Sequence, residues 1–232
     1  MIRFIQTLIS GLNLGAIYAL IALGYTMVYG IAKMLNFAHG DIIMIGAYAV
    51  IVTVFNLKLP GLLAVLIAVL VCALLGILIE FLAYKPLRES SPLAVLITAI
   101  GVSYFLQNIA LLIFGSEQIA FPTILHLPNL VLGEVEISGM TLVTLAVTAV
   151  IMVLLTLFIN CSLTGKAMRA VSEDKAAAEL MGISVNRTIS VTFAIGSALA
   201  AIASVFFGAT YVYLTPTTGA MPGIKAFTAA VF

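Results

Sequence analysis

The sequence predicts an all-α protein whose helices form a polytopic transmembrane bundle, with about six full spans and the start of another. Three observations support this fold class. Of the 232 residues, 63% are hydrophobic and only 8% are charged, whereas a soluble domain carries about 25% charged residues. The mean hydropathy is +1.27. Several uncharged apolar runs reach 18 residues or more, which is long enough to cross a hydrocarbon core.

The expected spans can be followed along the chain by these apolar runs. The first run, Phe4–Ala32, is too long for the core of a cleaved signal peptide, so we expect it to be retained as a span. Tyr211–Gly223 contains two prolines and two glycines and is expected to be a loop or a broken element. The run 226–232 is interpreted as the start of a further span, so the single transmembrane domain 1–232 is expected to be truncated at its C-terminus. The expected spans are 4–29, 42–57, 62–83, 93–114, 140–159 and a sixth that begins near residue 188.

Small residues predict where spans pack closely against one another. In the first span, Gly11 and Gly15 lie four residues apart and would let another helix approach. The sixth span carries a longer ridge of small residues at the same spacing: Gly196, Ala200, Ser204 and Gly208.

Basic residues predict the orientation of the bundle, because cytoplasmic loops are enriched in lysine and arginine. Alternating spans place Arg3, Lys58 and Lys225 on one side and seven basic residues on the other. The loop 160–187 is therefore expected in the cytoplasm and the loop 115–139 outside the cell. The loop 115–139 contains three glutamates and no basic residue, which agrees with this orientation. The seven residues are Lys33, Lys85, Arg88, Lys166, Arg169, Lys175 and Arg187.

The stretch Lys33–Asp41 is unusually polar for its position between two apolar runs. Two interpretations are open: a helix break beside a transport path, or a short turn at the membrane surface in which Asp41 caps the next helix. If the stretch is a break within the membrane, the predicted side of the N-terminus changes. One histidine and one aspartate are too few for a metal site, and no nucleophile lies beside a base, so no catalytic role is expected. The residues concerned are Asn36, His39, Gly40 and Asp41.

The fourth expected span carries a second group of polar side chains. Ser103 and Gln107 lie four residues apart on one helical face, and Asn108 is adjacent. Polar groups at this depth face protein or a cavity rather than lipid. They are candidates for lining a transport path, although hydrogen bonding between helices is the interpretation that the pattern favours.

The segment Asn160–Arg187 concentrates four basic and three acidic residues between two apolar spans. Its Ala-rich part predicts one helix over Gly165–Met181 that ends at Gly182, with Ala170, Ala177, Leu180 and Met181 able to share a face. Such a segment is either a surface for a partner in the aqueous phase or a plain solvated connector. Arg169 and Glu173 are spaced to pair with each other or to face that partner.

The sequence contains no motif that would let the protein drive transport by itself. No phosphate-binding loop of the Gly-x4-Gly-Lys-Ser/Thr type is present, and the spans hold no series of acidic residues and histidines for a proton relay. The net charge of +1 gives no reason to expect nucleic-acid binding, and no cofactor is expected. These features fit a membrane subunit that is driven by a separate ATPase.

Two stretches of the sequence resemble a known family. The run LNFAHGDIIMIGAY (Leu35–Tyr48) and the loop TGKAMRAVSEDKAAAELMGI (Thr164–Ile183) are similar to segments of the permeases of branched-chain amino-acid ABC importers, the LivH group. The loop also resembles the general importer pattern Glu-Ala-Ala, three residues, Gly. Ala177, Ala178 and Gly182 match that pattern, but Ala176 stands where glutamate is usual.

The resemblance implies the ABC-importer permease type of fold and a function in ATP-driven, alternating-access import of leucine, isoleucine or valine. It implies a multi-pass protein of the bacterial inner membrane that works with a second, similar permease, two cytoplasmic ATPases and an extracytoplasmic binding protein, for which the loop 115–139 is the expected docking surface. Two other functions remain open from the residues alone: an ATP-independent channel or facilitator, and a sugar-type permease of the same superfamily. The residues expected to couple to the ATPase are Gly165, Arg169, Glu173, Ala177, Ala178 and Gly182.

Overall fold

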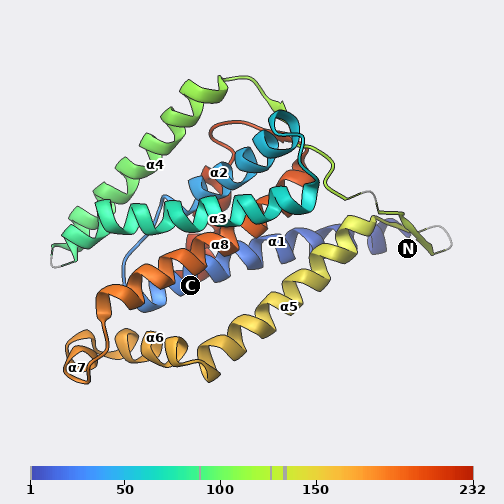
Figure 1. Ribbon diagram of the computed structural model, residues 1–232. Helices are drawn as coiled ribbons and strands as arrows, with labels where there is room; N and C mark the ends of the chain where they lie inside the picture. The colour runs from blue at the N-terminus through green and yellow to red at the C-terminus, as the bar shows by residue number, and fades with distance from the viewer. Residues whose placement is uncertain (1, 89, 126, 133–134, 232) are drawn as a thin grey trace.

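The computed structural model describes residues 2–88, 90–125, 127–132 and 135–231, and these residues are mostly helical (Figure 1). Within these described ranges, six helices are long and apolar enough to cross a membrane, which confirms the predicted fold class. A π-helical turn, Val52–Asn56, continues α2; a π-helical turn, Glu80–Tyr84, and a 3-10 turn, Lys85–Leu87, continue α3. The α-helices are α1 (Ile2–Ala32), α2 (His39–Ile51), α3 (Gly61–Ile79), α4 (Pro92–Phe114), α5 (Gly139–Cys161), α6 (Leu163–Glu173), α7 (Lys175–Leu180), α8 (Val185–Tyr211) and α9 (Ala220–Val231).

The bundle has two distinct ends (Figure 1). At the hairpin end, β2 (Leu130–Leu132) and β3 (Val135–Ile137) form an antiparallel pair close to the start of α1. Near the same end, β1 (Ile119–Ala120) pairs with β4 (Tyr213–Leu214). At the opposite end, which we call the α6 end, lie α6, α7 and the connection between α3 and α4. His126, Gly133 and Glu134 of the predicted loop 115–139 lie outside the described residues, as do Met1 and Phe232 of the predicted domain.

Helix α8 is the central helix of the bundle, and α1, α2 and α3 approach it through glycines. A Cβ added at Gly24 of α1 would lie 2.8 Å from the carbonyl oxygen of Gly196. A Cβ at Gly46 of α2 would lie 2.7 Å from Ser204 Oγ, and Gly76 of α3 meets the backbone of α8 at a similar distance. The predicted ridge of small residues on α8 therefore does mediate close helix packing.

The glycines in the first half of α1 do not behave in the same way. A Cβ added at Gly11 or Gly15 would have no heavy atom of the described residues within 4 Å. This pair therefore makes no close contact within the part of the chain that the structure describes. The predicted close packing of another helix on Gly11 and Gly15 is wrong for the helices of this chain. The reason is that the start of α1 extends away from α8, and Phe4, Leu8 and Leu12 are exposed on it.

The stretch 211–223 is less irregular than predicted, because α9 already begins at Ala220. Pro222 lies in the first turn of α9, where a missing backbone N–H costs no intrahelical hydrogen bond. The run 226–232 was expected to start a further span, and its residues 226–231 form the second half of α9.

Helix α9 also corrects the position predicted for Lys225. Its Nζ donates a hydrogen bond of 3.2 Å to Tyr18 Oη, midway along α1, so Lys225 lies within the length of the bundle and not beyond its hairpin end. The prediction placed Lys225 with Arg3 and Lys58, because a loop was expected up to Gly223. The comparison of basic residues now sets seven at the α6 end against two at the hairpin end, which strengthens the predicted orientation.

Candidate functional site

The break between α1 and α2 is buried inside the bundle. Asn36, His39 and Asp41 are each no more than 2% exposed. Tyr84 Oη donates a hydrogen bond of 2.9 Å to Asn36 Oδ1, and the backbone N–H of Asn36 donates one of 3.3 Å to Tyr25 Oη. Non-helical backbone at membrane depth is tolerated where protein buries it or where it lines a cavity. These contacts favour a helix break over a turn at the membrane surface.

The break still returns the chain towards the end of the bundle at which α1 starts. α1 runs to the α6 end, the chain turns back into the bundle, and α2 then runs from inside the bundle towards the hairpin end (Figure 1). The side of the N-terminus therefore stays as the basic residues predict.

Asp41 joins the start of α2 to the middle of α4. Its Oδ1 accepts a hydrogen bond of 2.9 Å from Gln107 Nε2, which also donates one of 3.2 Å to Ser103 Oγ. The predicted capping role of Asp41 is wrong: α2 begins at His39, Ala38 occupies the cap position without a side-chain bond, and Asp41 bonds to another helix instead. Asn108 does not join this group, because its Nδ2 donates to its own helix at Tyr104 O, 2.7 Å away, and its side chain is exposed.

Unused hydrogen-bonding capacity remains beside this contact. Asp41 Oδ2 and both ring nitrogens of His39 are buried, and none of them makes a hydrogen bond to a described residue. His39 packs edge-on against Tyr25, with ring centroids 5.8 Å apart. A buried polar atom without a partner is costly in a finished structure, so these groups are suited to a transient polar ligand.

A surface pocket of about 320 Å³ reaches this polar group from outside the helix bundle. Gln107 lines the pocket and at the same time bonds to Asp41, so it connects the pocket wall to the buried carboxylate. Sequence reasoning missed the threonines in this wall, which come from the connection between α8 and α9. The lining residues are Gln107, Asn108, Leu111, Ser116, Thr215, Pro216 and Thr217.

The predicted coupling segment forms two helices and not one. Ser162 Oγ accepts a bond of 2.9 Å from Gly165 N and caps α6. Asp174 has extended backbone angles and ends α6, and its Oδ1 accepts bonds of 2.8 and 3.0 Å from Ala176 N and Ala177 N, which caps α7. Aspartate is a preferred N-cap residue, and this signal was present in the sequence within the Ala-rich run. Gly182 follows α7 with φ of +80°, a conformation that glycine tolerates.

The six residues predicted for coupling divide into a buried and an exposed set. Gly165 and Ala178 are buried and hold α6 and α7 against the bundle. Arg169 is exposed and bonds weakly to Asn160 Oδ1 at 3.4 Å, so the predicted pairing with Glu173 is not made. The exposed residues are Arg169, Glu173, Ala177 and Gly182.

The surface of this segment also presents apolar side chains. Leu163, Leu180 and Met181 are 84%, 89% and 82% exposed. Of the four residues predicted to share a face, Ala170 packs against the hydrophobic core, whereas Ala177, Leu180 and Met181 are exposed. Large apolar side chains on a polar segment outside the spans are typical of a protein–protein contact.

We expect replacement of Asp174 by alanine to loosen α7 selectively. Loss of an N-cap side chain costs about 0.5–2 kcal/mol, and α7 has only six residues to compensate for it. Hydrogen exchange of the α7 amides should accelerate, while that of α8 stays unchanged. Exchange in α7 as slow as in the unchanged protein would contradict the capping role.

Two further contacts at the α6 end join segments that are distant in the sequence. Lys175 Nζ donates a bond of 3.0 Å to Ala32 O, the last carbonyl of α1. Burial, together with the positive charges of Arg88 and Lys33, holds the pKa of Lys175 below its ordinary value. This contact joins α7 to the start of the buried break, 143 residues away in the chain.

The second contact is a buried charge cluster between α3 and α8. Glu80, with no exposed surface, forms an ion pair with Arg88 and accepts a bond of 2.6 Å from Ser190 Oγ. Arg88 also donates to Asn186 Oδ1.

Comparison with known proteins gives a consistent result. A family model described as "Branched-chain amino acid transport system / permease component" matches residues 7–232. The chain is 45% identical to the high-affinity branched-chain amino acid transport system permease protein BraD of Pseudomonas aeruginosa, over 99% of this chain and 78% of BraD. It is 43% identical to the permease protein LivH of Escherichia coli strain K12, over 98% of this chain and 78% of LivH.

A more distant relative carries the same designation. The probable branched-chain amino acid transport permease protein LivH of Methanocaldococcus jannaschii is 30% identical over 91% of this chain and 68% of that protein. No solved structure matches the chain. The match over nearly the whole chain makes it one component of a transport system with further subunits, and not an enzyme. The chain belongs to the family of permease components of branched-chain amino acid transport systems.

Proposed function

We propose that this chain is the permease subunit of an ATP-driven importer that moves branched-chain amino acids into the cell by alternating access. The observation that carries the proposal is the segment α6–α7, which is charged, exposes large apolar side chains and yet is anchored to the bundle. A plain connector needs neither the exposed apolar residues nor the bond from Lys175 to α1. ATP hydrolysis would take place on separate subunits that bind this segment.

The contacts of α7 could transmit a movement of such a subunit to the buried break between α1 and α2. Lys175 bonds to the last carbonyl of α1, and Lys33, the next residue, has a left-handed φ of 57° that is unfavourable for a side chain other than glycine. The buried stretch from Asn36 to Asp41 follows directly. A displacement of α7 would therefore act on the residue at which the chain turns back towards the polar group of α2 and α4.

The partners and the location follow from the same proposal. A second, homologous permease would complete the path, two ATPases would bind the α6–α7 segments on the cytoplasmic side, and an extracytoplasmic binding protein would dock on the loop 115–139. The location would be the bacterial inner membrane. The excess of basic residues at the α6 end supports this orientation.

Reconstitution of the complete system in proteoliposomes tests the function. We expect uptake of radioactive leucine only when ATP and the loaded binding protein are both supplied. Uptake of leucine that persists without any ATPase would favour a facilitator and would contradict the proposal. Loss of uptake on omitting the binding protein would support its role as the donor of cargo.

Charging the exposed apolar tip of the segment should separate the permease from its ATPase. We expect the double variant Leu180→Glu and Met181→Glu to reduce ATPase co-purification and uptake at least tenfold, because both side chains are more than 80% exposed and would be buried on docking. Leu57→Glu is the matched control, since Leu57 is 59% exposed near the hairpin end. Normal co-purification of the double variant would contradict the docking role.

A further inference from the structure

Lys225 is a charged residue within the depth of the bundle, and it faces outwards. Gly24 of α1 contacts Gly196, near the middle of α8. Tyr18 lies six residues from Gly24, about 9 Å towards the hairpin end, whereas α8 continues for about 22 Å beyond Gly196. Since Lys225 Nζ bonds to Tyr18 Oη, this ammonium group lies well inside the length of α8.

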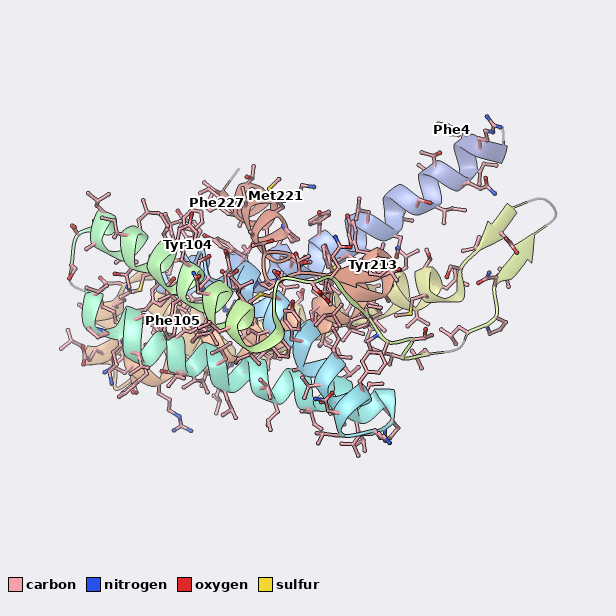
Figure 2. All side chains as sticks on the ribbon, turned by 90° about the horizontal axis from the view of Figure 1, so that it is seen from above. Phe4, Tyr104, Phe105, Tyr213, Met221 and Phe227 are labelled. Atoms are coloured by element: carbon pink, nitrogen blue, oxygen red, sulfur yellow. The ribbon has the colours of Figure 1, made fainter. Side chains whose placement is uncertain are left out.

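The position of Lys225 is enforced by the backbone of α9. Gly219 and Gly223 pack directly on Gly40 at the start of α2, where a Cβ on Gly40 would come within 3.0 Å of Gly223 Cα. Phe227 then packs on Tyr25, with ring centroids 5.9 Å apart. Figure 2 shows α9, marked by Met221 and Phe227, beside the inner part of α1 and far from Phe4.

Among the described residues, Lys225 has no negatively charged partner. Within the described ranges of the chain, Arg88 and Glu80 form the only ion pair, and the Lys225 side chain is exposed. A charged group at this depth faces a water-filled path or another subunit rather than lipid, and it normally has an opposite charge to meet. Within the described part of the chain, the ammonium group of Lys225 therefore has no counter-charge.

The chemistry around Lys225 fits one kind of anion. The ammonium has three donors, of which Tyr18 accepts one, so two remain available. The ammonium also lies 4.9 Å from the centre of the Tyr18 ring, which holds it in place. Two adjacent donors match the two oxygens of a carboxylate. Met221, one helical turn before Lys225, is 62% exposed and offers an apolar surface beside it.

We propose that Lys225 and Tyr18 bind the carboxylate group of the amino-acid cargo as it passes through the bundle, with Met221 beside the aliphatic side chain. This inference rests on the proposed import function. The contact with Lys225 and Tyr18 would let the transporter select an amino acid over an amine that has no carboxylate. Asp41 bonds to Gln107 of α4, whereas Gly40 contacts the start of α9, so the polar group around Asp41 is separate from the Lys225 site.

Displacement of bound radioactive leucine from the purified, complete transporter tests the inference, with two probes. 4-Methylpentanoate retains the carboxylate of leucine and lacks the ammonium, whereas 3-methylbutylamine lacks the carboxylate. We expect the unchanged transporter to prefer 4-methylpentanoate at least tenfold, and the variant Lys225→Gln to lose this preference together with at least tenfold of the uptake rate. Lys225→Arg should retain both the preference and the uptake rate. Tyr18→Phe should give values between those of the unchanged transporter and Lys225→Gln.

The controls separate this inference from the proposed function. Lys58→Gln removes the same charge near the hairpin end and should leave both readouts unchanged. If Lys225→Gln keeps the preference, or if it only weakens association with a partner subunit, the inference is wrong while the import function stands. If the unchanged transporter takes up no branched-chain amino acid, the proposed function itself fails.

Discussion

Replacement of Gly40 by alanine is expected to reduce leucine uptake at least tenfold. The added Cβ would collide with the carbonyl oxygen of Gly219 and approach the Gly223 Cα, and both are backbone atoms that cannot rotate away. Overpacking of this kind costs about 1–3 kcal/mol. Relief would require α2 and α9 to move apart, which displaces Asp41 from Gln107 and Lys225 from Tyr18 together. Uptake by the reconstituted transporter measures the effect.

Gly101→Ala is the matched control for this substitution. Gly101 lies within α4, and a Cβ added there would have no described heavy atom within 4 Å. Because alanine favours a helix over glycine by up to about 1 kcal/mol, this variant should be at least as stable as the unchanged protein. Equal uptake by the Gly40→Ala and Gly101→Ala variants would show that the contact between α2 and α9 is dispensable.

Replacement of Glu80 by glutamine is expected to be the most destabilising of the substitutions considered. It would leave Arg88, which is only 13% exposed, without a counter-charge, and it would weaken the bond from Ser190. Removal of one partner of a buried ion pair costs about 3–5 kcal/mol. The free energy of unfolding of the purified permease in detergent, followed by denaturant titration, should fall by about this amount.

A double variant distinguishes the loss of the ion pair from a loss of packing. When Glu80→Gln is combined with Arg88→Met, no unpaired charge remains buried, so the double variant should be more stable than Glu80→Gln alone. Glu117→Gln, at an exposed position, should leave the unfolding transition unchanged. A Glu80→Gln variant as stable as Glu117→Gln would mean that the cluster contributes nothing to the folded bundle.

The spans were predictable because composition and run length report directly on burial in lipid. The ridge from Gly196 to Gly208 was predictable for a similar reason, since spacing alone places small residues on one face of a helix. The polar residues of Lys33–Asp41 marked an interruption between two apolar runs. They carry no information on depth, so the choice between a surface turn and a buried break needed the contacts of Asn36 and Asp41.

The rest could not be read from the sequence because it depends on contacts between distant segments. Ser190 lies 110 residues from Glu80, and Lys225 lies 207 residues from Tyr18. Gln107 and Ser103 were identified as polar neighbours, but their bond to Asp41 requires the packing of α2 on α4. In contrast, the break at Asp174 was missed although its signal was local, because the Ala-rich run favoured one continuous helix.

The central claim is that the α6–α7 segment faces the cytoplasm, where an ATPase can bind it, and the native cysteines test this directly. Cys161, at the end of α5 next to this segment, is exposed, whereas Cys72 is buried and serves as an internal control. Membrane-impermeant maleimide should modify Cys161 in inside-out vesicles and leave it unmodified in intact spheroplasts. Addition of the purified ATPase subunits should slow the modification. Rapid modification of Cys161 from outside intact spheroplasts would contradict the account.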